Sequence, residues 1–473
     1  PGEPKVNRLR IIHLFEADYN FVLKLLWGSR LVRRGEDKKQ LNNNQHGSRH
    51  DRQGLDPVHL QLISMDLCRI LKLDMASFDN DASACYDRII VALGMLAARR
   101  LGMPDNAIRC HAQALEMMKY TVKTIYGISE RNYKGTPFEP LFGTGQGSGA
   151  SPAVWLTLVV ILLNTLDRLI ESRMTFTSPD RKQLHQRLAD AFVDDTSMGF
   201  TSPGLLTYSD MIIELQHIAQ TWEKLLHYSG GALNLKKCHW WLMYWEWIDG
   251  RPTLRPHRPD EYANIYLSKG SDTKTMYPIR HSDLSQANRI LGVYLAPNGD
   301  FSKQLSVLRS KAQQYSTRLR KSRLTPSEAY TFYRTTYIPA MTYTLPALAC
   351  DEEELHQVQS AVLPALLNQL GAHSKYPTAL RHGPTLYAGL DLIDLKTESG
   401  IYLLKSLRDS IFSDKEHGRM MITSIKTSQL ESGLSDNLLQ CPNFYLVFDS
   451  HLGDNNPPVF TQPRHDSTTH RPT

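Results

Sequence analysis

Residues 191–197 read AFVDDTS, and this stretch is the most informative one for the fold and the chemistry of the chain. Three apolar residues precede Asp194 and Asp195, and two small hydroxyl residues follow them. An Asp-Asp pair is common in tight turns, where it closes a hairpin without any chemical role. The same pair can hold a divalent cation, because carboxylate oxygens are hard ligands. The longer segment LADAFVDDTSMGF (188–200) has the pattern of strand, tight turn and strand, so a hairpin is predicted there.

The composition is that of a globular protein with a sizeable core. The chain has 473 residues, 41% of them hydrophobic and 22% charged, which suits about two to four compact units. Its net charge of +6 is mildly basic and compatible with a nucleic-acid partner. The cysteines are scattered without a Cys-x-x-Cys pair, which argues against a zinc module and favours reduced thiols in an intracellular protein. The apolar run AVWLTLVVILL (153–163) is shorter than the roughly 20 residues of a membrane span, so we expect a buried helix and no membrane partner.

A second acidic stretch lies upstream, at the end of a predicted strand. The segment FDNDASACYDR (78–88) continues into a predicted helix starting near Asp87. Asp81 at this strand end can act as a simple helix cap. Asp79 lies two residues earlier and shares a strand face with Asp81. If Asp81 converges with the Asp-Asp turn, the carboxylates can hold two hard cations that clamp a phosphoryl transfer.

A glycine-rich loop, GTGQGSGASP (143–152), lies between the two acidic stretches and precedes the apolar helix. Glycines let the backbone approach a phosphate, base or sugar closely, with the N–H groups of the helix start facing the ligand. Such loops are also common connectors, so this loop identifies no site by itself.

In their order and spacing, these motifs resemble the reverse transcriptases, and more narrowly those of non-LTR, LINE-type retrotransposons. The matching positions, motif by motif, are Asp81, Tyr86 and Asp87; Gly143, Gln146, Gly147, Ser151 and Pro152; Phe192, Val193, Asp194 and Asp195; Asn234 and Lys237; and Leu291 with Gly292. Upstream, RIIHLFEADYN (10–20) resembles the finger segment of the family and QHGSR (45–49) its Q-x-G-x-R motif. The resemblance covers roughly residues 8–400. Asn20 departs from it where the family often has lysine, as does Ile11 where it has proline.

The resemblance implies an α+β fold of the right-hand polymerase type, with fingers, a palm built on an antiparallel sheet, and a helical thumb. The expected divisions are 1–70 as fingers, 71–247 as palm with 100–140 partly in the fingers, 248–284 as a variable insertion, 285–412 as thumb and following helices, and 413–473 as a polar, partly disordered tail.

The same resemblance implies a catalytic site with two Mg²⁺ ions, or Mn²⁺ as an alternative, bound by Asp81 and Asp194 with Asp195 as a weaker ligand. Lys237 would protonate the pyrophosphate leaving group or balance its charge; it is otherwise a solvated surface lysine. The implied nucleotide-binding residues are Arg10, Ala82, Tyr86, Gln146 and Gly147, and the implied primer or template contacts are Gln45, Arg49, Leu291 and Gly292.

Two of these assignments have plain structural alternatives. Tyr86 matches the ring that packs under the incoming sugar and excludes a 2′-hydroxyl, but it can also be an ordinary core aromatic. Arg10 matches a triphosphate contact, but it can also be a surface arginine on an edge strand. A run without acidic residues, 303–323, carries seven Lys or Arg, which suits a thumb helix along a duplex backbone or a solvated helix face.

The implied function is that of an RNA-directed DNA polymerase that extends a primer 3′-hydroxyl. Its partners would be an RNA template, a DNA or RNA primer and dNTPs, and its location intracellular and, by family analogy, nuclear. A group II intron-type or domesticated reverse transcriptase and a decayed element that binds nucleic acid without activity are the alternatives. The intact acidic set Asp81, Asp194 and Asp195 argues against decay, and Tyr86 argues against an RNA-copying RNA polymerase. No segment resembles an endonuclease, a ribonuclease H or a zinc knuckle.

Overall fold

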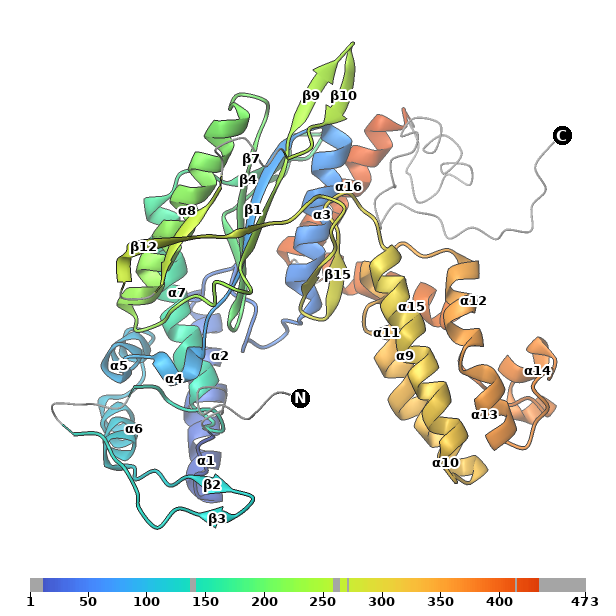
Figure 1. The fold of residues 1–473 in the computed structure, drawn as a ribbon, viewed down its shortest axis with the longest axis horizontal. Coiled ribbons are helices and arrows are strands. Elements are labelled where there is room, and N and C mark those ends of the chain that lie inside the picture. The colour runs from blue at the N-terminus through green and yellow to red at the C-terminus, as the bar shows by residue number, and fades with distance from the viewer. Residues whose placement is uncertain (1–11, 137–141, 258–263, 270–271, 413–414, 434–473) are drawn as a thin grey trace.

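A mixed sheet forms the centre of the protein, as Figure 1 shows. The computed structural model describes residues 12–136, 142–257, 264–269, 272–412 and 415–433. The strand order is β13-β8-β1-β7-β6, and only the short β13 runs parallel to its neighbour. The strands are β1 (Asp74–Asp81), β6 (Ala189–Phe192), β7 (Asp195–Ser202), β8 (His239–Met243) and β13 (Arg280–His281). Helices surround this sheet, which confirms the predicted mixed α+β class.

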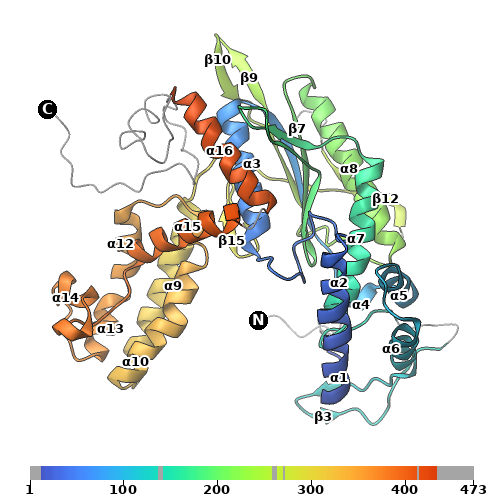
Figure 2. The ribbon, with the colours of Figure 1, turned by 180° about the vertical axis from the view of Figure 1, so that it is seen from behind.

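The central strand β1 is buried along its whole length, and its alternating side chains enter two different cores. Ala76 and Phe78 face α7 (Ser151–Leu169) and α8 (Tyr208–Tyr228) in one core. Met75 faces the other core, which contains α3 (Leu55–Leu71). Each face of the sheet is therefore covered by helices (Figures 1 and 2).

The helices on the α7 side extend the molecule away from the sheet. The N-terminal helix is continuous through α1 (Ala17–Leu23), a π-helical stretch (Lys24–Leu31) and α2 (Val32–Asp37). The helices α4 (Cys85–Arg88), α5 (Val91–Arg100) and α6 (Asp105–Met117) lie on the same side of the sheet (Figure 1). The sequence predicts one helix over 107–127, but α6 ends at Met117 and a hairpin of β2 (Lys123–Thr124) and β3 (Gly127–Ile128) follows. The β-branched residues of TVKTI (121–125) and the following Gly127 account for the early end.

A helical unit follows the hairpin of β14 (Asn288–Ile290) and β15 (Val293–Leu295), which confirms the helical pattern predicted over 304–412. Its helices are α9 (Ser302–Lys321), α10 (Pro326–Phe332), α11 (Ile338–Thr342), α12 (Glu352–Ser360), α13 (Leu363–Gln369), α14 (Thr378–His382) and α15 (Leu395–Phe412), with short π and 3₁₀ turns between them. Further hairpins are β4 (Met174–Thr177) with β5 (Leu184–Arg187), β9 (Trp245–Ile248) with β10 (Arg251–Leu254), and β11 (Tyr266–Lys269) with β12 (Asp272–Pro278).

Two segments differ from the sequence-based divisions. The predicted insertion 248–284 supplies β13, which completes one edge of the central sheet. The predicted polar tail contains α16 (Glu416–Glu431), which packs against α3 and reaches β5 through a hydrogen bond between His185 and Thr423. The buried face of α16 combines Met420, Met421 and Ile425 with small or polar residues such as Gly418 and Ser424, so the hydrophobic pattern that would predict the helix is weak.

Among the described residues, one helix, α7, is long and apolar enough to cross a membrane. Of its most apolar window, 61% is buried inside the protein, as in the core helix of a globular protein.

The close pairing of β1 and β7 generates a stability prediction. Gly199 of β7 lies so near β1 that a Cβ atom there would overlap the carbonyl oxygen of Ala76. Because that oxygen belongs to the backbone of a buried strand, Gly199→Ala should lower the free energy of unfolding by ~1–3 kcal/mol in urea denaturation. Gly400→Ala is the matched control: no atom lies within 4 Å of the new methyl group, and α15 should gain up to ~1 kcal/mol. Equal effects of the two changes would contradict the steric argument.

Candidate active site

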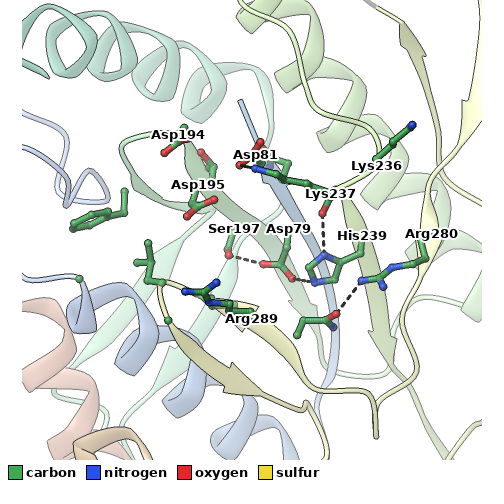
Figure 3. Close-up of a pocket in the computed structure, with 18 of the residues that line it drawn as sticks. Asp79, Asp81, Asp194, Asp195, Ser197, Lys236, Lys237, His239, Arg280 and Arg289 are labelled. Atoms are coloured by element: carbon green, nitrogen blue, oxygen red, sulfur yellow. Dashed lines mark hydrogen bonds and ion pairs between the residues drawn. The ribbon is translucent and has the colours of Figure 1, made fainter. Parts of the chain in front are cut away.

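The acidic residues of the two motifs meet where three strands end (Figure 3). Asp81, the last residue of β1, lies directly opposite Asp195, the first residue of β7, in the antiparallel register. Asp194 precedes it in the turn, and its carbonyl oxygen accepts a 2.9 Å hydrogen bond from the backbone N–H of Ala82. Pairing of β1 with β7 therefore brings together carboxylates that are more than a hundred residues apart in sequence.

The turn that carries Asp194 is strained and held from both sides. Val193 adopts a left-handed conformation with φ of 57°, which is rare for a β-branched residue. Trp155 of α7 donates a 2.6 Å hydrogen bond from its indole N–H to the carbonyl of Val193. On the other side, Gly47 lies so close that a Cβ atom would be 2.5 Å from the nitrogen of Val193. Such strain persists only where the surroundings fix the backbone, and it is common at functional sites.

The QHGSR segment (45–49) supports the hairpin from behind. His46 donates its backbone N–H to Ala191, and Ala191 donates in turn to Asn44, with distances of 2.8 Å. Gln45 is buried at 1% exposure beside this bridge. Arg49 binds both carboxylate oxygens of Glu36 and two backbone carbonyls. The structure thus places Gln45 and Arg49, predicted as primer or template contacts, in the support of the turn and not in the wall of the pocket.

Lys237 completes the charged cluster. The segment between α8 and β8 folds back so that Asn234 donates its backbone N–H to the carbonyl of Asp81 at 2.9 Å. The ammonium of Lys237 then lies 2.8 Å from Oδ1 of Asp81. This hydrogen bond raises the pKa of Lys237, and the nearby Asp194 and Asp195 act in the same direction. The lysine is therefore held as a cation, with 63% of its side chain exposed to the pocket.

An open pocket of about 1040 Å³ contains this cluster. Of the predicted site residues, it is lined by Asp81, Asp194, Asp195, Lys237, Leu291 and Gly292. Leu291 and Gly292 form the turn of the β14–β15 hairpin, and the hydroxyl of Tyr343 donates to the carbonyl of Leu291 at 2.9 Å. The Leu-Gly element thus faces the acidic residues across the pocket.

The like charges raise the proton affinity of one member of the cluster. The pKa of the Asp195 carboxyl is raised to about 6, because its surroundings remove water from it and because Asp194 and Asp81 carry negative charge nearby. Asp195 remains exposed toward the pocket, so solvent screens part of this repulsion. Within the described ranges, no group of three or more His, Cys, Asp and Glu side chains is arranged to hold a metal ion by itself.

The remaining predicted nucleotide contacts lie beside the pocket. Tyr86 is half buried against the core of α7 and α8, and burial, followed by the charges of Cys85 and Asp194, raises the pKa of its hydroxyl. Its backbone carbonyl accepts a hydrogen bond from Thr144 of the glycine-rich loop. This loop is thereby attached directly to the segment that follows Asp81. Arg10 lies outside the described residues.

The glycine-rich loop is also fixed by the segment around residues 12–20. Gln146 accepts a 2.7 Å hydrogen bond from the backbone of His13. The side-chain amide of Asn20 donates to the carbonyl of Gly147 at 3.1 Å and accepts from the N–H of Gly149 at 2.6 Å. Asn20 therefore holds this loop by two hydrogen bonds, one as donor and one as acceptor.

The pocket also contains residues that the sequence analysis did not single out. Five of them are basic or histidine residues, namely Lys236, His239, Arg280, Arg289 and Lys311, and Tyr343 also lines the pocket. Lys311 belongs to the basic run 303–323, so its charge was visible in the sequence. Arg280 and His239 are neighbours only because β13 pairs with β8, which no local pattern predicts.

No protein-family model matches the chain, and no curated protein matches it. Among solved structures, it is similar to telomerase from Candida albicans in complex with the TWJ fragment of telomeric RNA, at 11% identity and a TM-score of 0.40, covering 89% of this chain and 56% of that one. It is also similar to telomerase from Candida tropicalis in complex with the TWJ fragment of telomeric RNA, at 10% identity and a TM-score of 0.36, covering 92% of this chain and 58% of that one. The apo form of the Candida tropicalis telomerase matches at 11% identity and a TM-score of 0.33, covering 92% of this chain and 59% of that one.

The chain spans less than two thirds of the length of these telomerases.

The raised pKa of Asp195 generates a pH prediction. Because the folded protein binds this proton more tightly than the unfolded chain, the associated stability is complete below the ordinary pKa of 3.8 and is lost as the pH rises through about 6. Asp195→Asn should therefore exceed the parent in free energy of unfolding at pH 8 by up to ~1 kcal/mol and match it near pH 3.5. Urea denaturation in EDTA measures the difference. Asp37→Asn, which removes an exposed aspartate far from the pocket, should show no such trend; an equal trend there would refute the assignment.

Proposed function

We propose that the chain is an RNA-directed DNA polymerase domain that extends a primer 3′-hydroxyl with dNTPs. The observation that carries the proposal is the pairing of Asp81 with Asp195, which gathers Asp81, Asp194 and the cation of Lys237 at one end of the sheet. Carboxylates at adjacent strand ends suit phosphoryl transfer, where catalysis consists mainly of positioning and charge stabilisation. The non-LTR, LINE-type assignment rests on the order of the motifs in the sequence.

The proposed right-hand layout follows from the position of this cluster. We assign the five-stranded sheet with α3, α7 and α8 as palm, and the N-terminal helices with α5 and α6 as fingers. The helical unit from α9 onward is the proposed thumb. In that assignment the β14–β15 hairpin, which shares the pocket with Asp81, lies where a primer end would be held.

The acidic residues are suited to Mg²⁺ held jointly with a substrate. The described residues offer no complete protein cage, and Mg²⁺ is commonly bound by one or two carboxylates together with substrate phosphates. Burial raises the pKa of Asp195 most, and the nearby charges of Asp194 and Asp81 raise it further; a divalent cation would neutralise those charges. We propose Asp81 and Asp194 as the principal ligands and Asp195 as the weaker one. When bound, the ions would lower the pKa of the primer hydroxyl and neutralise charge on the phosphoryl group.

The chain's own cations would position the nucleic acid. Lys237 is held at Asp81 by its hydrogen bond, where an ammonium can balance the charge of a departing pyrophosphate. Arg289 and Lys311 line the opposite part of the pocket, on the β14–β15 hairpin and on α9. Basic residues at these positions suit contacts to backbone phosphates, which fix position without reading sequence.

Primer extension on an RNA template with Mg²⁺ and dNTPs tests the function. Asp194→Asn should reduce the rate by more than the about 10–100-fold that loss of an outer-shell partner costs. Equal product from the parent and Asp194→Asn would exclude the assigned site. A parent chain that binds an RNA–DNA duplex but extends no primer would identify the decayed element instead.

Tyr86 generates a separate prediction about sugar selection. If its ring lies under the incoming sugar, Tyr86→Ala should raise rNTP incorporation relative to dNTP by about 10-fold or more, since the excluded group is of methylene size or larger. Single-nucleotide incorporation with matched rNTP and dNTP measures the ratio. Tyr86→Phe keeps the ring and should keep the parent's preference. An unchanged ratio in Tyr86→Ala would leave Tyr86 as a core aromatic only.

A further inference from the structure

Asp79 is a buried carboxylate directly beneath the acidic cluster. It lies two residues before Asp81 on β1, so both side chains are on the α3 face of the sheet. Its side chain is 8% exposed, yet it lines the floor of the same pocket. A charge in such a place is costly unless hydrogen bonds and partners compensate it.

The compensation comes from three different elements. Ser197 of β7 donates its hydroxyl to Oδ1, and Gln61 of α3 donates its amide to the same oxygen at 3.3 Å. Trp241 of β8 donates its indole N–H to Oδ2 at 3.3 Å. His239, also of β8, places Nε2 3.3 Å from Oδ2 (Figure 3). One carboxylate thus connects β1 to both neighbouring strands and to the helix below.

The register shows what these connections control. Asp79 is directly opposite Ser197 on one side and His239 on the other. Ser197 is two residues from Asp195, and His239 is two residues from Lys237, so these two ties each lie one pleat below a member of the cluster. The ring of His239 also has Nδ1 3.4 Å from the carbonyl of Lys237. Moving either strand relative to β1 would move Asp195 or Lys237 relative to Asp81.

We propose that Asp79 is a positioning residue that sets the spacing of Asp81, Asp195 and Lys237 by tying β7 and β8 to β1. The inference rests on the proposed polymerase function, but it concerns a residue that does not itself touch the reacting atoms. Asp74, at the other end of β1, provides the contrast. It is also buried and its Oδ1 accepts the backbone N–H of Trp245, but it lines no part of the pocket.

Asp79→Asn and Asp74→Asn are therefore matched variants, each removing one buried charge from β1 while keeping its shape. In primer extension, Asp79→Asn should lower kcat by about 10–100-fold, the range for residues that orient metal ligands, with KM for dNTP within about 2-fold. Mn²⁺ binding without primer or nucleotide, followed by electron paramagnetic resonance, should weaken by about 10-fold. Asp74→Asn should leave kcat and Mn²⁺ binding unchanged, whatever its thermal stability.

Parental kcat and Mn²⁺ binding in Asp79→Asn would overturn the inference, as would an equal loss in Asp74→Asn. If Asp79→Asn does not fold, Ser197→Ala provides the test, because it removes one hydrogen bond to Asp79. Ser197→Ala should lower both kcat and Mn²⁺ binding. Parental values of both in Ser197→Ala would overturn the inference. Asp194→Asn separates the two proposals. If Asp194→Asn is inactive and Asp79→Asn is not impaired, the positioning role alone fails; if Asp194→Asn is fully active, the polymerase site itself fails.

Discussion

The antiparallel pairing of β1 with β7 is the constraint on which the site depends. Its register places Asp81 opposite Asp195, and like charges directly opposite one another on a sheet are destabilising. This repulsion occurs at a strand end, where solvent reaches the side chains and screens their charges. The ammonium of Lys237 also lies 2.8 Å from Asp81. The pKa of Asp195 is raised first by burial and then by the charges of Asp194 and Asp81, which Lys237 only partly offsets. A site built in this way is most stable when positive charge enters the pocket.

Several motif residues support the backbone of the site. Gly47 allows the loop before α3 to approach Val193, and Trp155 holds the Val193 carbonyl from α7. Arg49, although basic, donates its guanidinium hydrogen bonds to Glu36 and to backbone carbonyls. The strained turn therefore has supports from two segments that are distant in sequence. A spacing match alone does not distinguish such supports from residues that contact a substrate.

The sequence predicts the parts of the site that carry their own local pattern. The hairpin at 188–200, the buried helix at 153–163 and the strand ending at Asp81 each show apolar periodicity interrupted by polar residues, and the structure contains all three. Arg280 and His239 could not be predicted, because their proximity depends on a parallel edge strand that returns from a distant, polar segment. The helix α16 was missed for a related reason. Its buried face carries Met420, Met421 and Ile425 among mostly small and polar residues, a weaker apolar pattern than that of α7.

The glycine-rich loop is held in place by the side chain of Asn20. Gly147 has φ of 107°, a conformation open to glycine, and its carbonyl is held by the amide of Asn20. A lysine at position 20 would offer donors only, whereas asparagine also accepts the N–H of Gly149. The amide therefore fixes the loop on both sides of Ser148 with a short, neutral side chain. This loop meets the Tyr86 carbonyl on its other side, through the N–H of Thr144. Residues 12–20 and the strand end at Asp81 are thus joined through one loop, and loosening Asn20 would displace Gln146 before it affected the carboxylates.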